Sequence, residues 1–356
     1  MSSTFIMLVS FIIPAYNAAS TIKRCLDSIY ALPLDPKEFE VVLIDDCSKD
    51  NTIAIVEKYS YIHSNITLLR QQNNNRQGAA RNRGVSVAKG EYVCFVDSDD
   101  AVANGIVVAI RLAKEKQTDM TAFHYVNSNE FGEITIEEEH LGFAQGQAFT
   151  GIEMQNKHPY WCSGPVAYVY SKEFLERVDY PFAEGVFYED SDFVIVHLYY
   201  AGRMAYSPGL GYFAYYREGS TTRSMTHKNW ADYLLLGTRL LAFHTIIQHD
   251  IEQGGKTNLG ICRFAESVLE GACYNVTKAL KCLYKLDNWL EIKAFYDRVD
   301  AHVDRRALSK DKRLYKYSNY WSGLASIGIK NKFFSIALNT CFSVVYKVVQ
   351  KHKKQT

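Results

Sequence analysis

The sequence lacks the local patterns of a disulfide-rich, secreted or zinc-binding protein. Its eight cysteines are scattered, form no Cys-x-x-Cys pair and mostly stand in apolar segments, which predicts reduced core residues in a cytosolic protein. The apolar run Phe5–Ile13 is too short to span a bilayer, and neither a basic stretch nor a cleavage site flanks it, which predicts no signal peptide. No His-Glu-x-x-His or related spacing occurs, so we expect no zinc site.

Glycine-rich phosphate loops are also missing from the first part of the chain. No Gly-x-Gly-x-x-Gly follows any early strand-like segment, which argues against a dinucleotide-dependent oxidoreductase. A sugar-nucleotide pyrophosphorylase should open with a glycine-rich, Arg- or Lys-containing loop, whereas the corresponding segment reads Pro14-Ala15-Tyr16-Asn17. At 356 residues and 47% apolar, the chain can nevertheless bury a large core and a second region.

Positive charge is concentrated at the C-terminal end, although the whole chain carries a net charge of only +1. Residues 301–356 contain twelve lysines and arginines against two aspartates, a balance that suits an anionic surface or a solvated tail. The apolar stretch Phe333–Val349 is interrupted by Asn339 and Thr340, so it is more typical of an interfacial segment than of a spanning one. We expect residues 333–356 to contact a membrane surface; packing on the core and nucleic-acid binding are the alternatives.

The first 125 residues alternate short β-branched runs with longer segments of helical period, which predicts an α/β fold. We expect a Rossmann-like, mostly parallel sheet flanked by helices, followed by a Leu-rich helical region beyond Trp230. Strands are predicted at Val9–Ile13, Glu40–Ile44, Ile66–Leu69, Tyr92–Val96 and Met120–Phe123. Helices are predicted at Thr21–Ala31, Thr52–Ser60, Gln77–Ala88 and Ile106–Lys116.

Ligands of such sheets bind at the carboxyl ends of the strands. Polar or flexible residues follow each of the first four predicted strands, so we expect these four loops to line one crevice. They are Pro14-Ala15-Tyr16-Asn17, Asp45-Asp46, Asn73-Asn74-Asn75-Arg76 and Asp97-Ser98-Asp99-Asp100. The polar segment 127–147 predicts a hairpin over the site.

The segment Asp97–Asp100 places three carboxylates at the end of an apolar strand. Such a concentration of like charge destabilises the fold unless a cation neutralises it, and oxygen ligands suit Mg²⁺ or Mn²⁺. The metal would offset the charge that develops on a leaving diphosphate. Capping of the next helix is the alternative, but a cap needs one carboxylate and not three.

The remaining loops suggest a nucleotide and its phosphates. A carboxylate of Asp45 or Asp46 could accept the imide N–H of uracil or a ribose hydroxyl, and Tyr16 could offer its face or hydroxyl. Gly78 and Arg81 stand at the start of a helix near the same crevice, where helix N-termini and arginines favour phosphate.

Four ordered motifs over about 100 residues resemble the family 2 glycosyltransferases. They are Phe11–Asn17, Val42–Ser48, Gly78–Gly84 and Phe95–Asp100. The resemblance implies a GT-A fold, a nucleotide-sugar donor that usually carries UDP, and a metal held by a DxD-type motif. It further implies that Asp99 is the main metal ligand, that Asp97 is a metal ligand or meets the donor sugar together with Ser98, and that Asp45 or Asp46 meets the base.

Later segments extend the resemblance to the acceptor side. Phe187–Phe193 is similar to the family's ED motif, which assigns the general base to Asp190; the alternative is that its carboxylates only stabilise a helix start. Arg217 lies in a segment similar to a loop that closes over the diphosphate, with an exposed loop charge as the alternative. The chain departs from the family at Ala167–Tyr170, where many relatives carry a lysine, so the acceptor stays open.

The resulting prediction is an inverting, metal-dependent glycosyltransferase of polysaccharide, capsule or lipopolysaccharide synthesis. Residues 1–225 would form the catalytic domain and residues 226–356 a helical accessory region. The donor would be a nucleotide sugar and the acceptor a saccharide or lipid-linked saccharide, at the cytoplasmic face of the cell membrane. A scaffold protein that kept the fold without turnover is the non-enzymatic alternative.

Overall fold

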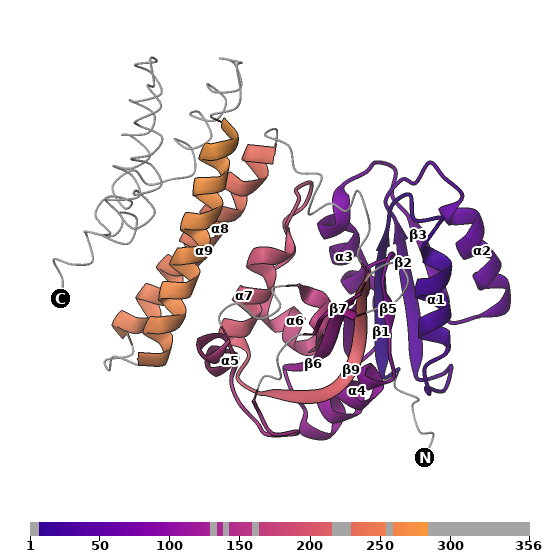
Figure 1. The fold of residues 1–356 in the computed structure, drawn as a ribbon, viewed down its shortest axis with the longest axis horizontal. Helices are drawn as coiled ribbons and strands as arrows, with labels where there is room; N and C mark the ends of the chain where they lie inside the picture. The colour runs from indigo at the N-terminus through magenta and orange to yellow at the C-terminus, as the bar shows by residue number, and fades with distance from the viewer. Residues whose placement is uncertain are drawn as a thin grey trace. The chain divides into compact units, whose positions relative to one another are not determined.

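The computed structural model describes residues 7–128, 134–137, 142–158, 164–215, 229–253 and 259–283. In this part of the chain one nine-stranded sheet runs in the order β3-β2-β1-β4-β8-β6-β9-β5, and β7 pairs with β6. Helices cover the sheet (Figure 1). The predicted α/β class is confirmed.

The elements follow the order in which strands and helices were predicted. The strands are β1 (Val9–Ala15), β2 (Phe39–Asp45), β3 (Ile66–Arg70), β4 (Tyr92–Phe95), β5 (Ala101–Val102), β6 (Met120–Ser128), β7 (Ile134–Glu137), β8 (Tyr168–Ser171) and β9 (Met204–Tyr215). The helices are α1 (Ile22–Tyr30), α2 (Thr52–Ile62), α3 (Arg76–Val87), α4 (Gly105–Lys116), α5 (Gly151–Lys157), α6 (Lys172–Val178), α7 (Asp190–Tyr200), α8 (Trp230–Gln253), α9 (Leu259–Leu283) and the 3-10 turn η1 (Pro165–Ala167). All five predicted strands and four predicted helices are present; some ends agree with the prediction and the others differ by up to five residues.

Strands β3, β2, β1 and β4 are parallel neighbours. Strands β1, β2 and β4 are buried on both faces, whereas the edge strand β3 is only partly buried. Because successive side chains of a strand point to opposite faces, Phe11 and Ile13 join the core beneath α1 and α4, whereas Ile12 faces α3. A Cβ on Gly84 of α3 would lie 2.3 Å from Ile12 Cγ2, so this helix packs directly on the strand. The apolar runs of the sequence therefore reflect a sheet that is covered on both sides.

The second half of the sheet is mixed rather than parallel. Strand β8 lies between β4 and β6 and is antiparallel to both, while β6 and β9 are parallel. Strand β9 also pairs with the short β5, which directly follows the carboxylate cluster. The hairpin predicted over 127–147 is described in part, since β7 pairs antiparallel with β6.

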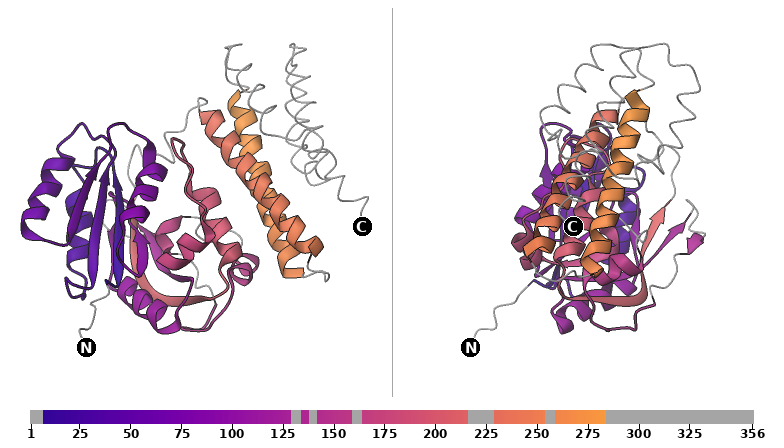
Figure 2. Two further views of the ribbon diagram at one scale, coloured as in Figure 1. Left: turned by 180° about the vertical axis from the view of Figure 1, so that it is seen from behind. Right: turned by 90° about the vertical axis from the view of Figure 1, so that its left-hand side faces the viewer.

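The chain divides into two compact units. The first comprises residues 1–225 and 239–270, and the second comprises residues 226–238 and 271–356. The first unit includes the end of α8 and the start of α9, which lie side by side (Figure 2). Phe243 of α8 and Phe264 of α9 both contact Tyr199 of α7. The domain boundary predicted after residue 225 stays a prediction.

Two predictions fall outside the described residues: the loop that contains Arg217, and the segment 333–356. Among the helices that are described, none combines the length and the hydropathy needed to cross a membrane.

Candidate active site

The carboxyl ends of the parallel strands lie next to one another. Ala15, Asp45 and Arg70 are direct neighbours across β1, β2 and β3. The backbone N–H of Asp46 donates to Ala15 O at 2.8 Å, and Val96 N–H donates to Ile12 O at 3.0 Å, which places Asp97 beside the end of β1. The predicted site residues at the ends of β1, β2 and β4 are therefore brought to one edge of the sheet.

The loop after β1 is fixed to the loop after β2. Asn17 adopts a positive φ of 50° and receives Lys49 N–H at its Oδ1 (2.8 Å), while its own N–H donates to Ser48 Oγ (2.9 Å). Tyr16 is 47% exposed at the tip of this loop. Pro14 and Ala15 were predicted as loop residues but belong to β1 and are buried, because the strand continues in register with β2.

The two carboxylates after β2 have different partners. Asp46 Oδ1 accepts the N–H of Asn75 at 2.8 Å, which ties this loop to the start of α3. Burial raises the pKa of Asp46, although hydrogen bonds from Asn75 and Arg76 act in the opposite direction. Asp45 Oδ2 accepts the N–H of Ser48, whereas its buried Oδ1 has no hydrogen-bond partner among the described residues. Asp45 therefore has spare acceptor capacity that Asp46 lacks at the same oxygen.

A hydrogen-bond donor without a partner among the described residues stands just after the neighbouring strand β3. Gln71 directly follows β3, and its N–H donates to Asp45 O at 2.8 Å. Its buried Nε2 has no hydrogen-bond partner in the described part of the chain. The sequence alone does not distinguish Gln71, because one polar residue at a strand end carries no recognisable pattern.

Asp100 is buried and is bound to the last residues of β9. Its Oδ2 accepts the hydroxyl of Tyr212 at 2.7 Å, and its Oδ1 accepts the N–H of Tyr215 at 2.8 Å. The Tyr212 oxygen also accepts Asp97 N–H at 3.1 Å. Burial, followed by the charges of the neighbouring carboxylates, raises the pKa of Asp100 well above its usual range. Asp100 thus orders the loop, and it caps no helix, since Asn104 precedes α4.

Asp97 and Asp99 are the two carboxylates of this loop that keep contact with solvent. The Asp97 side chain is 26% exposed, and Asp99 is also partly exposed. Arg24 of α1 donates to the main-chain oxygen of Asp99, and its guanidinium lies 3.7 Å from the centre of the Tyr215 ring. No group of three or more His, Cys, Asp or Glu in the described residues is arranged to hold a metal. Two partly exposed carboxylates two residues apart still fit a hard cation that takes its other ligands from water and phosphate.

Arg81 lies almost entirely inside the protein, with 2% of its side chain exposed. Its Nη2 is 2.8 Å from Asp97 Oδ1, and its Nη1 donates to the buried carboxylate of Glu189. Burial alone would lower the pKa of Arg81, but the carboxylates of Asp97, Glu189 and Asp190 outweigh it and raise the pKa. Arg81 therefore links the carboxylate loop to the start of α7.

Gly78 allows α3 to approach the segment that leads into α7. A Cβ at this position would lie 2.1 Å from the main-chain oxygen of Ala183. One turn along the helix, Asn82 holds Phe182 by two hydrogen bonds, from Nδ2 to Phe182 O (3.0 Å) and from Phe182 N–H to Oδ1 (2.9 Å). This close packing brings Arg81 within reach of Glu189.

Asp190 is the first residue of α7 and is partly exposed. Burial, the Glu189 carboxylate and the Asp97 carboxylate together raise the pKa of Asp190 to about 7, although Arg81 acts to lower it. A carboxylate with a pKa near the operating pH suits general base catalysis. Asp192, two residues later, is fully buried and bound to other side chains.

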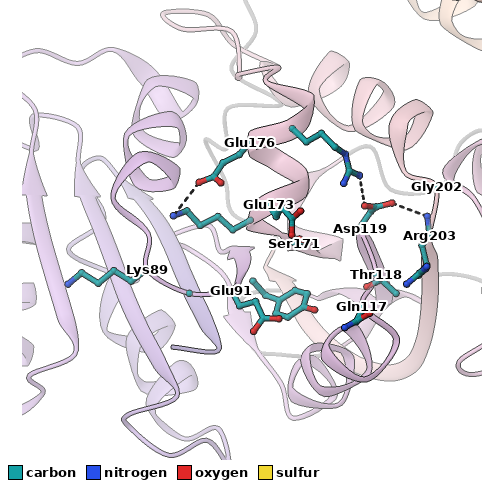
Figure 3. A pocket seen from close by; sticks show the side chains of 14 residues that line it. Lys89, Glu91, Gln117, Thr118, Asp119, Ser171, Glu173, Glu176, Gly202 and Arg203 are labelled. Carbon is teal, nitrogen blue, oxygen red and sulfur yellow. Dashed lines mark hydrogen bonds and ion pairs between the residues drawn. The ribbon is translucent and has the colours of Figure 1, made fainter. Parts of the chain in front are cut away.

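A hollow at the opposite end of the sheet contains none of the predicted site residues. It has a volume of about 840 Å³ and lies at the amino ends of β4 and β6 (Figure 3). Its charged side chains are largely paired: Asp119 contacts Arg177 at 2.6 Å, and Lys172 contacts Glu176 at 3.4 Å. Its position and balanced charge give no reason to place the chemistry there.

Part of the chain matches a known protein family. Residues 10–169 match the family "Glycosyl transferase family 2". The poly(ribitol-phosphate) beta-glucosyltransferase of Bacillus spizizenii is 35% identical over 117 residues, which are 32% of this chain and 18% of that protein. The succinoglycan biosynthesis protein ExoO of Rhizobium meliloti is 28% identical over 60% of this chain and 62% of its own length. The chain thus spans less than two thirds of these relatives.

Solved structures show the same fold. S. aureus TarS 1–349 in complex with UDP-GlcNAc is 27% identical, with a TM-score of 0.58 over 66% of this chain and 67% of that chain. The same protein in complex with UDP aligns over 98% of this chain and 92% of that chain, with a TM-score of 0.61 and 20% identity. Residues 10–169, which include the strand-end carboxylates of β2 and β4, are thus similar to glycosyl transferase family 2, and the likeness to TarS shows the same fold.

Proposed function

We propose that the protein transfers a sugar from a UDP-sugar to a hydroxyl of a saccharide or lipid-linked saccharide during cell-surface polysaccharide synthesis. The observation that carries the proposal is the buried bridge from Asp97 through Arg81 to Glu189, which sets the carboxylate loop beside Asp190. Relatives that act in poly(ribitol-phosphate) glycosylation and succinoglycan synthesis support the acceptor class. The TarS complex with UDP-GlcNAc supports the donor class.

The nucleotide would bind across the ends of β1, β2 and β3. Asp45 Oδ1 and Gln71 Nε2 offer an acceptor and a donor with no other partner among the described residues. These two groups suit the imide N–H and a carbonyl of uracil, and local side-chain movement would bring them to the base. Tyr16, exposed at the loop tip, would contact the nucleotide with its ring or hydroxyl.

The diphosphate would lie over the loop Asp97–Asp99. Asp99, with Asp97 beside it, would hold Mg²⁺ or Mn²⁺, since both carboxylates reach solvent while Asp100 is turned inward. When bound, the ion would offset negative charge on the departing UDP. The backbone of Ser98 would meet the donor, and Gly78 and Arg81 would shape the site from the start of α3. Arg217 stays a prediction for the diphosphate.

Asp190 would act as the general base. As the acceptor oxygen forms its bond to the anomeric carbon, the acceptor proton passes to an Asp190 carboxylate oxygen. The bond between that carbon and the diphosphate oxygen breaks, and UDP leaves with the electron pair. Attack from the side opposite UDP inverts the configuration, and the reaction gains from holding both partners in line.

The cytoplasmic face of the membrane is the proposed location. The clustered positive charge of residues 301–356 and the apolar stretch Phe333–Val349 support this proposal. Deletion of 333–356 should move the protein from membrane to soluble fractions, and unchanged partitioning would contradict the membrane contact.

A screen of nucleotide sugars tests the activity. UDP-glucose, UDP-GlcNAc and GDP-mannose are each offered with Mg²⁺, Mn²⁺ or EDTA, and both UDP or GDP release and thermal stabilisation are measured. We expect a metal-dependent response to a UDP-sugar that Asp99→Asn loses and that Asp119→Asn, at the other end of the sheet, retains. Metal dependence that persists in Asp99→Asn would refute the metal assignment. Stabilisation without turnover in the wild type would instead favour a binding protein.

A further inference from the structure

Asp192 lies in the first turn of α7, two residues after Asp190, and none of its surface is exposed. Its Oδ2 accepts the hydroxyl of Tyr180 at 2.7 Å and also the Nε–H of Arg239. Its Oδ1 has no hydrogen-bond partner in the described part of the chain. A buried carboxylate of this kind depends strongly on its one cationic partner.

Arg239 reaches this carboxylate from α8, 47 residues later in the chain. Its Nη2 donates to Pro181 O at 2.8 Å, and its guanidinium lies 4.5 Å from the centre of the Tyr180 ring. One side chain thus joins the first turn of α7 to the two residues Tyr180 and Pro181. Arg239 donates from Nε to Asp192 and from Nη2 to Pro181 O at the same time. The single ammonium group of lysine cannot reproduce this geometry.

The other side of the same segment is fixed by α3. Phe182 exchanges two hydrogen bonds with Asn82, and its ring stacks on Phe193 of α7 with 3.7 Å between centroids. The approach to α7 is therefore held between α3, which carries Arg81, and α8, which carries Arg239. Movement at the Arg239 end would shift the first turn of α7, where Asp190 begins the helix.

We propose that Arg239 is a positioning residue for sugar transfer, which sets the position of Asp190 through Asp192 and the segment Tyr180–Pro181. The inference rests on the proposed role of Asp190 as the base. A base held in line with its substrate loses efficiency steeply when it is displaced by a fraction of an ångström to an ångström. Arg239 itself need not touch substrate for this effect.

Kinetics of four variants test the inference, with UDP release from the best donor of the screen as the readout. We expect Arg239→Met to lower kcat at least about tenfold and to leave KM for the donor within about twofold, because the base and not the nucleotide site is displaced. Arg239→Lys should keep a melting temperature near that of the wild type, since it retains a charge beside Asp192, yet should lower kcat at least about threefold. The lysine variant carries the test where Arg239→Met folds poorly.

Arg177→Met is the matched control. It breaks another Arg–Asp ion pair, Arg177 with Asp119 at 2.6 Å. Asp119 lies at the other end of the sheet (Figure 3), so kcat should stay at the wild-type value. Wild-type kcat in Arg239→Lys, or in a folded Arg239→Met, would overturn the inference, provided that Asp190→Asn is inactive. Retained transfer in Asp190→Asn would instead refute Asp190 as the base. Failure of the Arg239 proposal and failure of the base assignment therefore give different results.

Discussion

The guanidinium of Arg81 lies 2.8 Å from the carboxylate of Asp97 and donates, from its other terminal nitrogen, to Glu189. These two carboxylates belong to segments 92 residues apart, one after β4 and one before α7. A buried cation between them stabilises their approach. The Arg81 bridge is the structural reason that the loop proposed to bind the donor lies beside the carboxylate proposed to activate the acceptor.

Loss of Arg81 should therefore weaken both the fold and the reaction. Arg81→Met leaves Asp97 and Glu189 without their shared cation, and we expect it to destabilise the protein by about 3 to 5 kcal/mol. Activity should fall by about 100-fold or more in the fraction that stays folded. Chemical denaturation and UDP-release kinetics measure the two effects. Arg83→Met, on the same helix, is the control and should change both by little, because the Arg83 side chain is bound at the surface to a backbone oxygen, Arg70 O, and joins no ion pair among the described residues.

The pH dependence of transfer should report on Asp190. Its pKa of about 7 reflects burial, the Glu189 and Asp97 carboxylates, and the opposing Arg81. Because a base must be deprotonated to accept a proton, kcat/KM, which reports on the free enzyme, should be constant above this pKa and should fall about tenfold for each pH unit below it. Glu189→Gln should move the acidic limb of the pH–activity curve to lower pH, because it removes a negative charge that raises the pKa of Asp190. A limb that stays in place would show that another group titrates.

The stability of the fold should also depend on the ionisation of Asp190, but it should favour the protonated form, whereas activity needs the ionised form. The folded protein holds a proton on Asp190 between the usual aspartate range and pH 7, where the unfolded chain has lost it. Ionisation of Asp190 therefore disfavours the fold, and its contribution to stability falls as pH rises toward 7 and stays low above it. At pH 8 we expect Asp190→Asn to melt on the order of 5 to 10 °C higher than the wild type. At pH 4 the two should melt together; a lower melting temperature of the variant at pH 8 would contradict the shift.

Gly78 should be intolerant of a side chain. A Cβ would lie 2.1 Å from Ala183 O, so Gly78→Ala must push α3 away from the segment before α7, at a cost of about 1 to 3 kcal/mol. Because Arg81 follows one turn later, activity should fall together with stability. Gly202→Ala is the control, since its Cβ would make only an ordinary contact of 3.7 Å with Asp119. Equal melting temperatures of the two variants would contradict the packing argument.

The fold of the first half could be predicted from sequence because each element carries its own local pattern. The apolar runs of β1, β2 and β4 and the helical period of α1 and α4 need no information from distant segments. The insertion of β8 between β4 and β6 could not be predicted in this way. It depends on pairing between residues about 75 positions apart, and the short run Tyr168–Ser171 does not specify a neighbour.

The carboxylates of the candidate site could be predicted from the sequence, but the residues that form hydrogen bonds with them could not. Asp45, Asp97 and Asp190 stand out because charge follows an apolar run or opens a helix. Their hydrogen-bond partners come from elsewhere in the chain: Tyr212 binds Asp100 from β9, and Arg239 binds Asp192 from α8. Neither side chain differs locally from an ordinary strand tyrosine or helix arginine, so only the folded chain reveals its role.

The assignment of Asp190 as the base is tested most directly by the rate of sugar transfer in Asp190→Asn, measured beside UDP binding by calorimetry in Mn²⁺. The substitution keeps the size of the side chain and removes its capacity to accept the acceptor proton. We expect kcat to fall roughly 10²- to 10⁴-fold while the affinity for UDP stays unchanged, because Asp190 serves the acceptor and not the nucleotide. Transfer within about threefold of the wild-type rate would contradict the assignment of the base.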